Sequence, residues 1–365
     1  MVQVENEIGM IPEARDRSAE AERQFDAPVP AELLDYLAKA VDTLAPELRA
    51  AWFKAGAKQA GTWSEVFGPG VATEEIFMAW QFARYVEAVT VAGKEEYPLP
   101  MFVNTALIRP GYLPGQYPSA GPLPHLIDVW RAGAPAIDFL APDIYYRNYT
   151  EWARRYTRSG NPLFVPETVR SSEASVNVLY TFGALDAMGF CPFDIESIAE
   201  PAARQLAESF GLVSQLTPLI AQHQGLGSMT GLMPEGPEQK QPQRVWLGGY
   251  LFHVSFERSI SSTIAEGIVN PPTAANVPAL PAGGLVIATG LDEFIFGGTG
   301  ITATFADRSG AKLQVGLLQV EEGCFVDGKW THVRWLNGDE TDQGRHVRLP
   351  PGQFCIQRVK LYRYN

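Results

Sequence analysis

The order of apolar runs and helical segments constrains the fold of this chain more than any other feature of its sequence. Short runs without polar alternation are separated by segments of helical periodicity. The runs are 99–104, 137–145, 163–167 and 190–195, and the helical segments are 73–93, 126–132, 151–158, 172–188 and 201–222. Runs of this kind are typical of parallel strands that are buried on both faces. The pattern therefore predicts an α/β fold, either a doubly wound sheet or a (β/α)8 barrel.

The sequence changes character near Gly225. Residues 227–243 are rich in Gly, Pro and Gln and are predicted to be a linker. Beyond them, short β-rich segments alternate with Gly, Asn and Asp turns, so we expect residues 244–365 to form an all-β sandwich or jelly roll. The α/β domain is expected to span 1–226. Within it, residues 10–72 carry two helical patterns, at 31–44 and 46–60, and are predicted to be an inserted helical excursion.

The composition argues against several classes of protein. The chain is 46% hydrophobic and 19% charged, as is typical of a soluble globular protein. Its formal net charge of −12 argues against nucleic acid as the main partner. The apolar runs are far shorter than the roughly 20 residues that a membrane-spanning helix needs. The 3 cysteines and 5 histidines lack metal-ligand spacing, so neither a metal site nor a cofactor is predicted.

Two glutamates follow apolar strands of the predicted sheet. Glu7 ends the stretch 2–7, and Glu167 ends the run 163–167. In a parallel barrel, the carboxyl ends of the strands form the catalytic face. Glycoside cleavage requires one carboxylic acid to protonate the leaving oxygen and one carboxylate to attack the sugar or to activate water. The two glutamates meet this requirement, although acids that begin helices would give the same spacing.

The sequence around both glutamates resembles a known family. Val2–Gly9 (VQVENEIG) resembles the acid/base signature of family 35 β-galactosidases, in which an Asn-Glu pair ends the fourth barrel strand. Phe164–Thr168 is similar to the nucleophile segment on the seventh strand of the same clan of retaining glycosidases. The region from Trp130 to Tyr145 is similar to the bacterial β-galactosidase-like branch. The resemblance covers most of the chain, including the expected sandwich.

This resemblance implies a mechanism and assigns roles to residues. It implies a retaining exo-glycosidase that hydrolyses terminal β-D-galactosides through a covalent glycosyl-enzyme intermediate. Glu167 would be the nucleophile, Glu7 the general acid/base, and Asn6 a hydrogen-bond partner of the sugar 2-hydroxyl. Glu5 is expected to point to the other side of the strand. Because Glu167 is negative, we expect it to raise the pKa of Glu7.

Further residues are candidates for substrate binding. The resemblance implies that Tyr145 donates its hydroxyl to Glu167, although Tyr146 competes for this role. Asn104 is expected either to contact a sugar hydroxyl or to cap the following loop. Trp63 is expected either to stack on a sugar ring or to lie in a helical core. The clan often has an aromatic residue after the last strand, where this chain has Phe193–Glu196 and no Trp, so the sugar preference stays open.

Counting strands from Glu7 leads to a partial barrel. If Glu7 ends strand four, the four later runs are strands five to eight, and we expect an incomplete barrel with two exposed apolar edges. Such a chain is expected to be weak or inactive alone. Its expected partners are a galactoside or oligosaccharide substrate and either a second copy or a complementing N-terminal barrel fragment. The alternatives are another β-glycosidase specificity of the clan and a catalytically silent carbohydrate-binding fragment. A secreted, a periplasmic and a cytoplasmic location all remain open.

Overall fold

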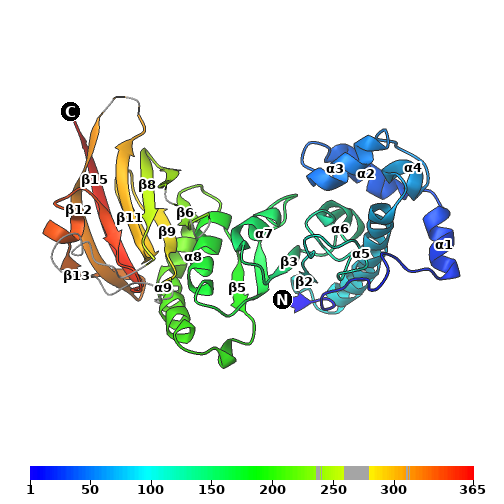
Figure 1. Ribbon diagram of the computed structural model, residues 1–365, viewed down its shortest axis with the longest axis horizontal. Helices are drawn as coiled ribbons and strands as arrows, with labels where there is room; N and C mark the ends of the chain where they lie inside the picture. Colours follow the sequence, from blue (N-terminus) through cyan, green and yellow to red (C-terminus); the bar gives the residue numbers. More distant parts are fainter. Residues whose placement is uncertain (236–238, 240, 259–278, 310, 312) are drawn as a thin grey trace. The chain divides into compact units, whose positions relative to one another are not determined.

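The chain folds into two compact units (Figure 1). The computed structural model describes residues 1–235, 239, 241–258, 279–309, 311 and 313–365. The first unit comprises Met1–Thr168 and Met188–Cys191, and the second comprises Val169–Ala187 and Pro192–Asn365. Together they contain one parallel and two antiparallel sheets, so the protein is of mixed α/β class.

A five-stranded parallel sheet forms the centre of the first unit. Its strands are β1 (Val2–Gln3), β2 (Met101–Ala106), β3 (Phe139–Ile144), β4 (Phe164–Thr168) and β5 (Gly189–Pro192). They lie side by side in chain order, and β1 to β4 pair in parallel. The strand order does not reverse, as it would at the switch point of a doubly wound sheet. The four apolar runs of the sequence form β2 to β5.

The opening strand is shorter than the sequence suggests. Only Val2 and Gln3 are extended, and Glu5 and Glu7 adopt left-handed backbone angles with φ of 62° and 46°. Such angles cannot continue a strand. The expectation that Glu5 points to the opposite side of a continuing strand is therefore wrong. Instead, the Tyr85 hydroxyl donates a hydrogen bond to Glu5 Oε1 at 2.7 Å.

Seven helices of the first unit are described. They are α1 (Ala19–Asp26), α2 (Ala31–Lys39), α3 (Pro46–Lys54), α4 (Trp63–Phe67), α5 (Val71–Glu96), α6 (Ile127–Gly133) and α7 (Tyr149–Arg155). The first four lie in the excursion at 10–72. In α2, Leu33, Leu34 and Leu37 share one buried face, as expected for an amphipathic helix. Among the helices of the described ranges, none has the length and apolar character needed to cross a bilayer.

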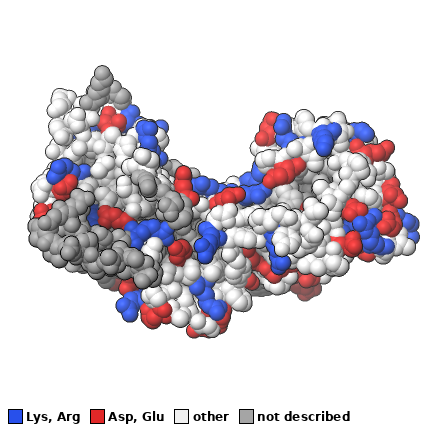
Figure 2. Space-filling model, viewed as in Figure 1, with Lys and Arg blue, Asp and Glu red and all other residues white. Residues whose placement is uncertain are grey.

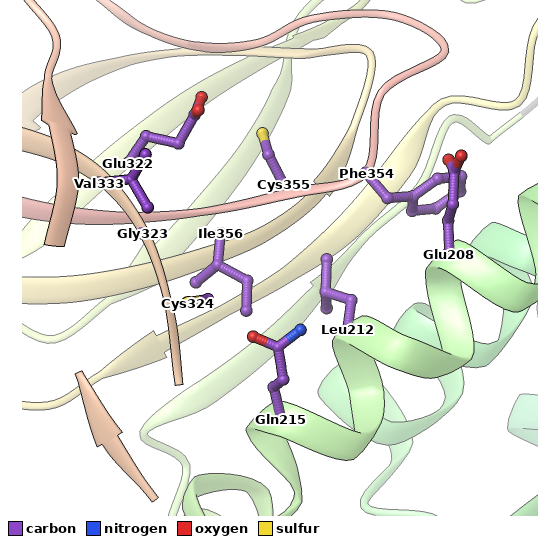
Figure 3. Close-up of a pocket in the computed structure, with 10 residues that line it drawn as sticks. All are labelled: Glu208, Leu212, Gln215, Glu322, Gly323, Cys324, Val333, Phe354, Cys355 and Ile356. Carbon is purple, nitrogen blue, oxygen red and sulfur yellow. The ribbon is translucent and has the colours of Figure 1, made fainter. Parts of the chain in front are cut away.

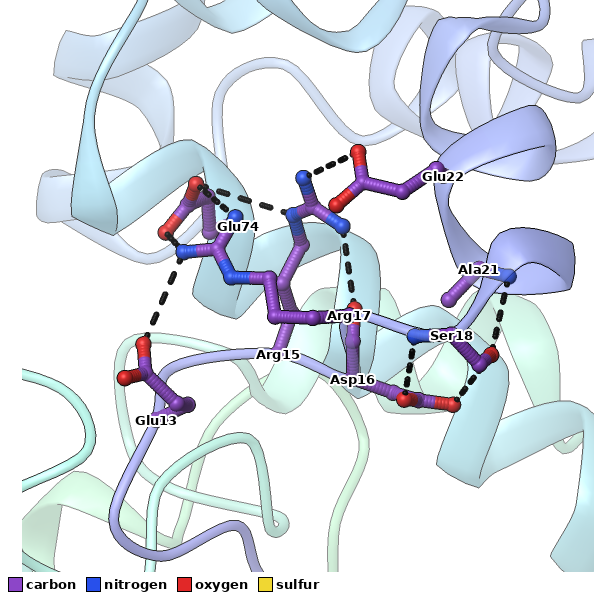
Figure 4. Close-up of polar contacts among 8 residues, drawn as sticks. All are labelled: Glu13, Arg15, Asp16, Arg17, Ser18, Ala21, Glu22 and Glu74. Atoms are coloured by element: carbon purple, nitrogen blue, oxygen red, sulfur yellow. Dashed lines mark hydrogen bonds and ion pairs between the residues drawn. The ribbon is translucent and has the colours of Figure 1, made fainter.

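Ion pairs tie the segment before α1 to the start of α5 (Figure 4). Arg17 donates two hydrogen bonds to Glu74, at 2.8 and 2.9 Å, and the buried Arg15 donates to Glu22 at 2.9 Å. Figure 2 shows the same intermixing of basic and acidic side chains on the visible surface. Because Arg17 is exposed, its pair with Glu74 is expected to contribute little to stability.

Two antiparallel sheets form most of the second unit. One has the order β13-β12-β15-β10-β9-β6, and the other has the order β14-β11-β8-β7. Side chains from both sheets, such as Phe252 and Phe296, form one hydrophobic core. The strands are β6 (Met229–Leu232), β7 (Gln243–Leu247), β8 (Tyr250–Phe256), β9 (Gly283–Ala288), β10 (Glu293–Thr299), β11 (Ile301–Asp307), β12 (Gln314–Val326), β13 (Lys329–Trp335), β14 (Val347–Leu349) and β15 (Cys355–Tyr364). The 3-10 helices η1 (Ile195–Ser197) and η3 (Gly338–Thr341) belong to the same unit.

Two helices expected in the α/β domain pack on the six-stranded sheet instead. They are α8 (Ala174–Leu185), which contacts β6 and β9, and α9 (Ala202–His223), which contacts β10 and β12. At Gly183, a Cβ atom would lie 2.8 Å from the Thr230 carbonyl oxygen, so only glycine permits this close approach. The expected domain boundary at residue 226 therefore does not coincide with the division into compact units. Helix α8 is buried continuously from Ala174 to Thr181, whereas α9 buries one apolar face, and either helix can pack on a sheet of any kind.

The expected linker at 227–243 is partly a strand. Met229–Leu232 forms β6, which pairs with β9 at the edge of the six-stranded sheet. Residues 236–238 and 240 of this segment lie outside the described residues. The segment thus contains the edge strand β6, and its last residue, Gln243, begins β7.

Three phenylalanines support the parallel sheet of the first unit. The rings of Phe102 and Phe139 are stacked, with centroids 5.2 Å apart and planes 5° from parallel. The Phe164 ring meets both edge to face, at 5.2 and 5.8 Å. The three side chains come from adjacent strands and form a separate hydrophobic cluster with Ala141.

We predict that Phe139→Ala destabilises the first unit by about 3–5 kcal/mol, because it removes a buried ring from this cluster. Hydrogen exchange of the β2–β4 amides in increasing urea measures the effect. The control is Phe53→Ala, whose ring is 46% exposed and whose loss is expected to cost about 1 kcal/mol. Equal costs for the two variants would show that the ring cluster is not the core of this sheet.

Candidate active site

Three carboxylates converge at the carboxyl ends of the parallel strands. Glu7 follows β1, Asp143 lies near the end of β3, and Glu167 lies near the end of β4, directly opposite Asp143 in the strand register. One carboxylate oxygen from each residue lies within 4.8 Å of the other two. The structure therefore brings together the two glutamates singled out from the sequence and adds a third acid.

Asp143 is the residue that sequence reasoning missed. It is buried within β3, all six residues of which are buried. The signal was present, because an ionisable group inside a fully buried strand is rare unless it is paired or functional. The run 137–145 predicts an apolar strand, and its spacing alone gives Asp143 no role.

Asn104 connects the cluster to the opening segment. Its Oδ1 accepts hydrogen bonds from the Glu7 backbone N–H and from Gln3 Nε2, both at 3.0 Å. Its Nδ2 donates to Asp143 Oδ2 at 2.7 Å and to Asn6 Oδ1 at 3.3 Å. These four bonds use the whole capacity of a side-chain amide. They also fix the left-handed turn that carries Glu7.

The roles expected for Asn104 are corrected by this geometry. Its side chain is completely buried, and its four hydrogen bonds are made within the protein. It is therefore not placed to contact a sugar hydroxyl, and it does not cap the loop after β2. Its partners lie on the neighbouring strand β3 and in the segment around β1, which spacing along the sequence could not indicate.

Tyr145 and Asn6 flank the cluster. The Tyr145 hydroxyl donates to Glu167 Oε2 at 2.7 Å, whereas the competing Tyr146 hydroxyl donates to the Ile108 carbonyl oxygen at 3.0 Å. Burial and the bond to Glu167 raise the pKa of Tyr145, so it stays a hydrogen-bond donor. Asn6 is exposed, and its oxygen accepts from Gln3 at 3.0 Å. Its amide nitrogen is therefore the atom that a ligand would use.

Trp63 does not belong to the site. It is 1% exposed in α4, and its ring packs against Phe67 and Phe77. Trp52 is buried too, and its indole N–H donates to the Lys58 carbonyl oxygen at 3.0 Å. The expected stacking of Trp63 on a sugar ring is wrong, because the ring is buried against Phe67 of α4 and Phe77 of α5. The alternative of a core tryptophan describes it correctly.

Burial and, after it, repulsion between like charges raise the pKa values in the carboxylate cluster. The pKa of Glu7 is raised by burial and then by the negative charge of Glu167, while a hydrogen bond with Asp143 opposes the shift. The pKa of Asp143 is raised to about 8 by burial and then by the charges of Glu167 and Glu7. Close like charges of this kind cannot all ionise near neutral pH, so the site retains at least one proton.

The same three residues are the metal-binding candidates within the described ranges. Three carboxylate oxygens within 4.8 Å suit a hard cation such as Mg²⁺ or Ca²⁺. However, donors already bind oxygens of two of the three groups, Asn104 on Asp143 and Tyr145 on Glu167. A bound proton relieves the repulsion between the carboxylates, and it does not need the several oxygen ligands that a metal ion requires.

A pocket in the second unit has fewer groups suited to catalysis than the carboxylate cluster has (Figure 3). It has a volume of about 250 Å³ and lies between α9 and the strands β12, β13 and β15. Gln215 on its wall accepts a hydrogen bond from the Phe325 backbone N–H at 3.0 Å. Burial raises the pKa of Cys355, which also lines the pocket, to about 12. That thiol stays protonated near neutral pH, so it is not a ready nucleophile.

The comparisons with known proteins add little. Residues 206–348 match a family described as a domain of unknown function, DUF5597, and this stretch lies within the second unit. The comparison with curated proteins found no match. A solved structure of AbfB, a family 51 α-L-arabinofuranosidase from Bifidobacterium longum, is 12% identical, with a TM-score of 0.24. The match covers 77% of this chain and 63% of that enzyme. A TM-score this low supports no conclusion about fold or activity.

We predict that Asn104→Asp destabilises the first unit by about 2–3 kcal/mol at neutral pH, because it replaces a buried donor by another acid. The loss is expected to be smaller near pH 4, where a buried acid with a raised pKa is protonated. Urea unfolding at both pH values measures it. Asn6→Asp is the control, since it keeps the accepting oxygen in an exposed position. An equal loss of unfolding free energy at the two pH values would contradict the view that the charge of the new acid causes the destabilisation.

Proposed function

We propose that the protein is a retaining exo-glycosidase that hydrolyses terminal β-D-galactosides. The observation that carries this proposal is the approach of Glu7 and Glu167 oxygens to within 4.8 Å at the carboxyl ends of β1 and β4. Retaining glycosidases hold their two carboxyl groups about 5–5.5 Å apart, whereas inverting enzymes need about 6.5–9.5 Å to admit a water molecule. The short separation supports direct attack by one of the two carboxylates.

The proposal includes a barrel origin for the first unit. Five parallel strands in chain order, with the carboxylates at their carboxyl ends, are what strands four to eight of a (β/α)8 barrel provide. In this assignment β1 is strand four and β4 is strand seven. The two antiparallel sheets of the second unit would be an accessory β-sandwich. The strands β1 and β5 are the edges of the sheet, so this chain is expected to turn over slowly. Substrates with activated leaving groups suit such a slow enzyme.

The proposal gives the two glutamates different roles. Glu167, held by Tyr145, would attack the anomeric carbon while the protonated Glu7 donates to the leaving oxygen. Formation of the glycosyl-enzyme removes the charge of Glu167, and the pKa of Glu7 then falls. Glu7 would next accept a proton from the attacking water. The exposed amide of Asn6 would meet the sugar 2-hydroxyl.

Chemical rescue by azide tests the roles of the two glutamates. With an activated aryl β-galactoside, Glu7→Gly is expected to be partly rescued by azide with formation of the β-galactosyl azide, and Glu167→Gly with formation of the α-anomer. Proton NMR of the products distinguishes the anomers. Glu5→Gln serves as the control, because Glu5 lies on the same segment but binds Tyr85. The opposite anomers would reverse the two assignments, and a panel of aryl glycosides identifies the preferred sugar.

Titration of Glu7 tests the coupling between the carboxylates. Because Glu167 contributes to the raised pKa of Glu7, Glu167→Gln is expected to lower that pKa. Carbon NMR of the labelled Glu7 carboxyl group as a function of pH measures it. Glu7→Gln is also expected to lower kcat by about 10²–10⁴-fold on substrates with poor leaving groups. A Glu7 titration that does not respond to Glu167→Gln would contradict the coupling.

A further inference from the structure

Asp143 has a buried oxygen that lacks a donor. Its side chain is 2% exposed, and Asn104 binds Oδ2. Its other oxygen, Oδ1, makes no hydrogen bond with any residue in the described ranges as long as the neighbouring acids are ionised. A buried acceptor without a donor is costly, and a buried charge beside two other carboxylates is more costly still. The geometry therefore requires either a proton or a cation at this oxygen.

The surrounding hydrogen bonds favour the proton. The Asn104 amide donates to Asp143 Oδ2 and the Tyr145 hydroxyl donates to Glu167 Oε2, so these two oxygens already have donors without a cation. Ca²⁺ takes about 6–8 oxygen ligands, and Mg²⁺ demands an octahedral set. One proton on Asp143, by contrast, converts the contact with the Glu7 carboxyl group into a hydrogen bond.

We propose that Asp143 is a positioning residue that stays a neutral carboxylic acid in the active protein, donates from Oδ1 to Glu7, and thereby orients the acid/base carboxyl group. This inference rests on the proposed function for the role of Glu7. Asn104 fixes which oxygen of Asp143 carries the proton, because Oδ2 already accepts its amide hydrogen at 2.7 Å.

The charges around Asp143 agree with a bound proton. The groups that face it are Glu7 after β1, Glu167 on β4, Tyr145 beyond its own strand and Tyr156 after α7. Burial, followed by the two glutamate charges, raises the pKa of Asp143 to about 8. The folded protein then binds a proton that the unfolded chain releases near pH 4, so Asp143 weakens the fold progressively as the pH rises from about 4 to about 8.

Two substitutions separate a neutral acid from a charged one. Asp143→Asn imitates the protonated form, because its oxygen can accept from Asn104 and its amide can donate to Glu7. It is expected to keep most of the activity on an activated aryl galactoside, with the alkaline limb of the pH profile close to its original position. Asp143→Ala removes the donor that lowers the pKa of Glu7. It is expected to lower kcat by about 100-fold and to move the alkaline limb to higher pH.

The closing experiment is a carbon NMR titration of the full chain with labelled Asp carboxyl groups, in which Asp143→Asn identifies the Asp143 signal. A midpoint near pH 8 supports the proposal, and so does a decline of the urea midpoint between about pH 4 and about pH 8 that Asp143→Asn abolishes. A midpoint near pH 4 overturns it. Loss of activity in Asp143→Asn as complete as in Glu7→Gln also overturns it.

Two further outcomes separate this inference from its premise. If Mg²⁺ or Ca²⁺ alone shifts the Asp143 signal and raises the melting temperature, the cluster is a cation site and the proposal is overturned. If the unaltered protein cleaves none of the aryl glycosides while Asp143 titrates near pH 8, the proposed function fails and the positioning role fails with it. The protonation of Asp143 stands in that case, since its measurement does not involve catalysis.

Discussion

The hydrogen bonds of Asn104 are the interaction on which the site depends. One completely buried amide accepts the Glu7 backbone N–H and donates to Asp143, and it also binds Gln3 and Asn6. It thereby joins the short strand β1 to β3 and holds Glu7 in a left-handed turn at the end of the sheet. Without this connection, nothing in the two-residue strand β1 would fix where the Glu7 carboxyl group lies relative to Glu167.

Backbone strain and repulsion between like charges, both of which destabilise the fold, occur together at the carboxyl ends of the parallel strands. Glu5 and Glu7 have positive φ angles, and three acids crowd the ends of β1, β3 and β4. Strained backbone and like charges persist only where the surrounding structure enforces them, and they are common at functional sites. Here the stacked Phe102 and Phe139 rings and the other buried residues of the sheet supply that support. The burial that stabilises the sheet also raises the pKa of Asp143 and Glu7.

Much of the first unit could be predicted from the sequence, because apolar runs between helical segments identify buried parallel strands. The left-handed turn at Glu5–Glu7 could not, since hydrogen bonds to a residue about a hundred positions away impose it. Asp143 was missed because two acids, Asp138 and Asp143, do not change the apolar character of the run 137–145. The sheet on which α8 and α9 pack, and the burial of Trp63, depend on tertiary contacts that amphipathic periodicity does not specify.

The central claim is that Glu167 forms a covalent bond to the sugar, and trapping that bond tests it most directly. The reagent is an activated aryl β-galactoside in which fluorine replaces the 2-hydroxyl group, because this change slows hydrolysis of the intermediate more than its formation. Intact mass spectrometry is expected to show the addition of one fluorogalactosyl group, and peptide mapping is expected to place it on Glu167. An unmodified protein, or a label on any other residue, would contradict the account.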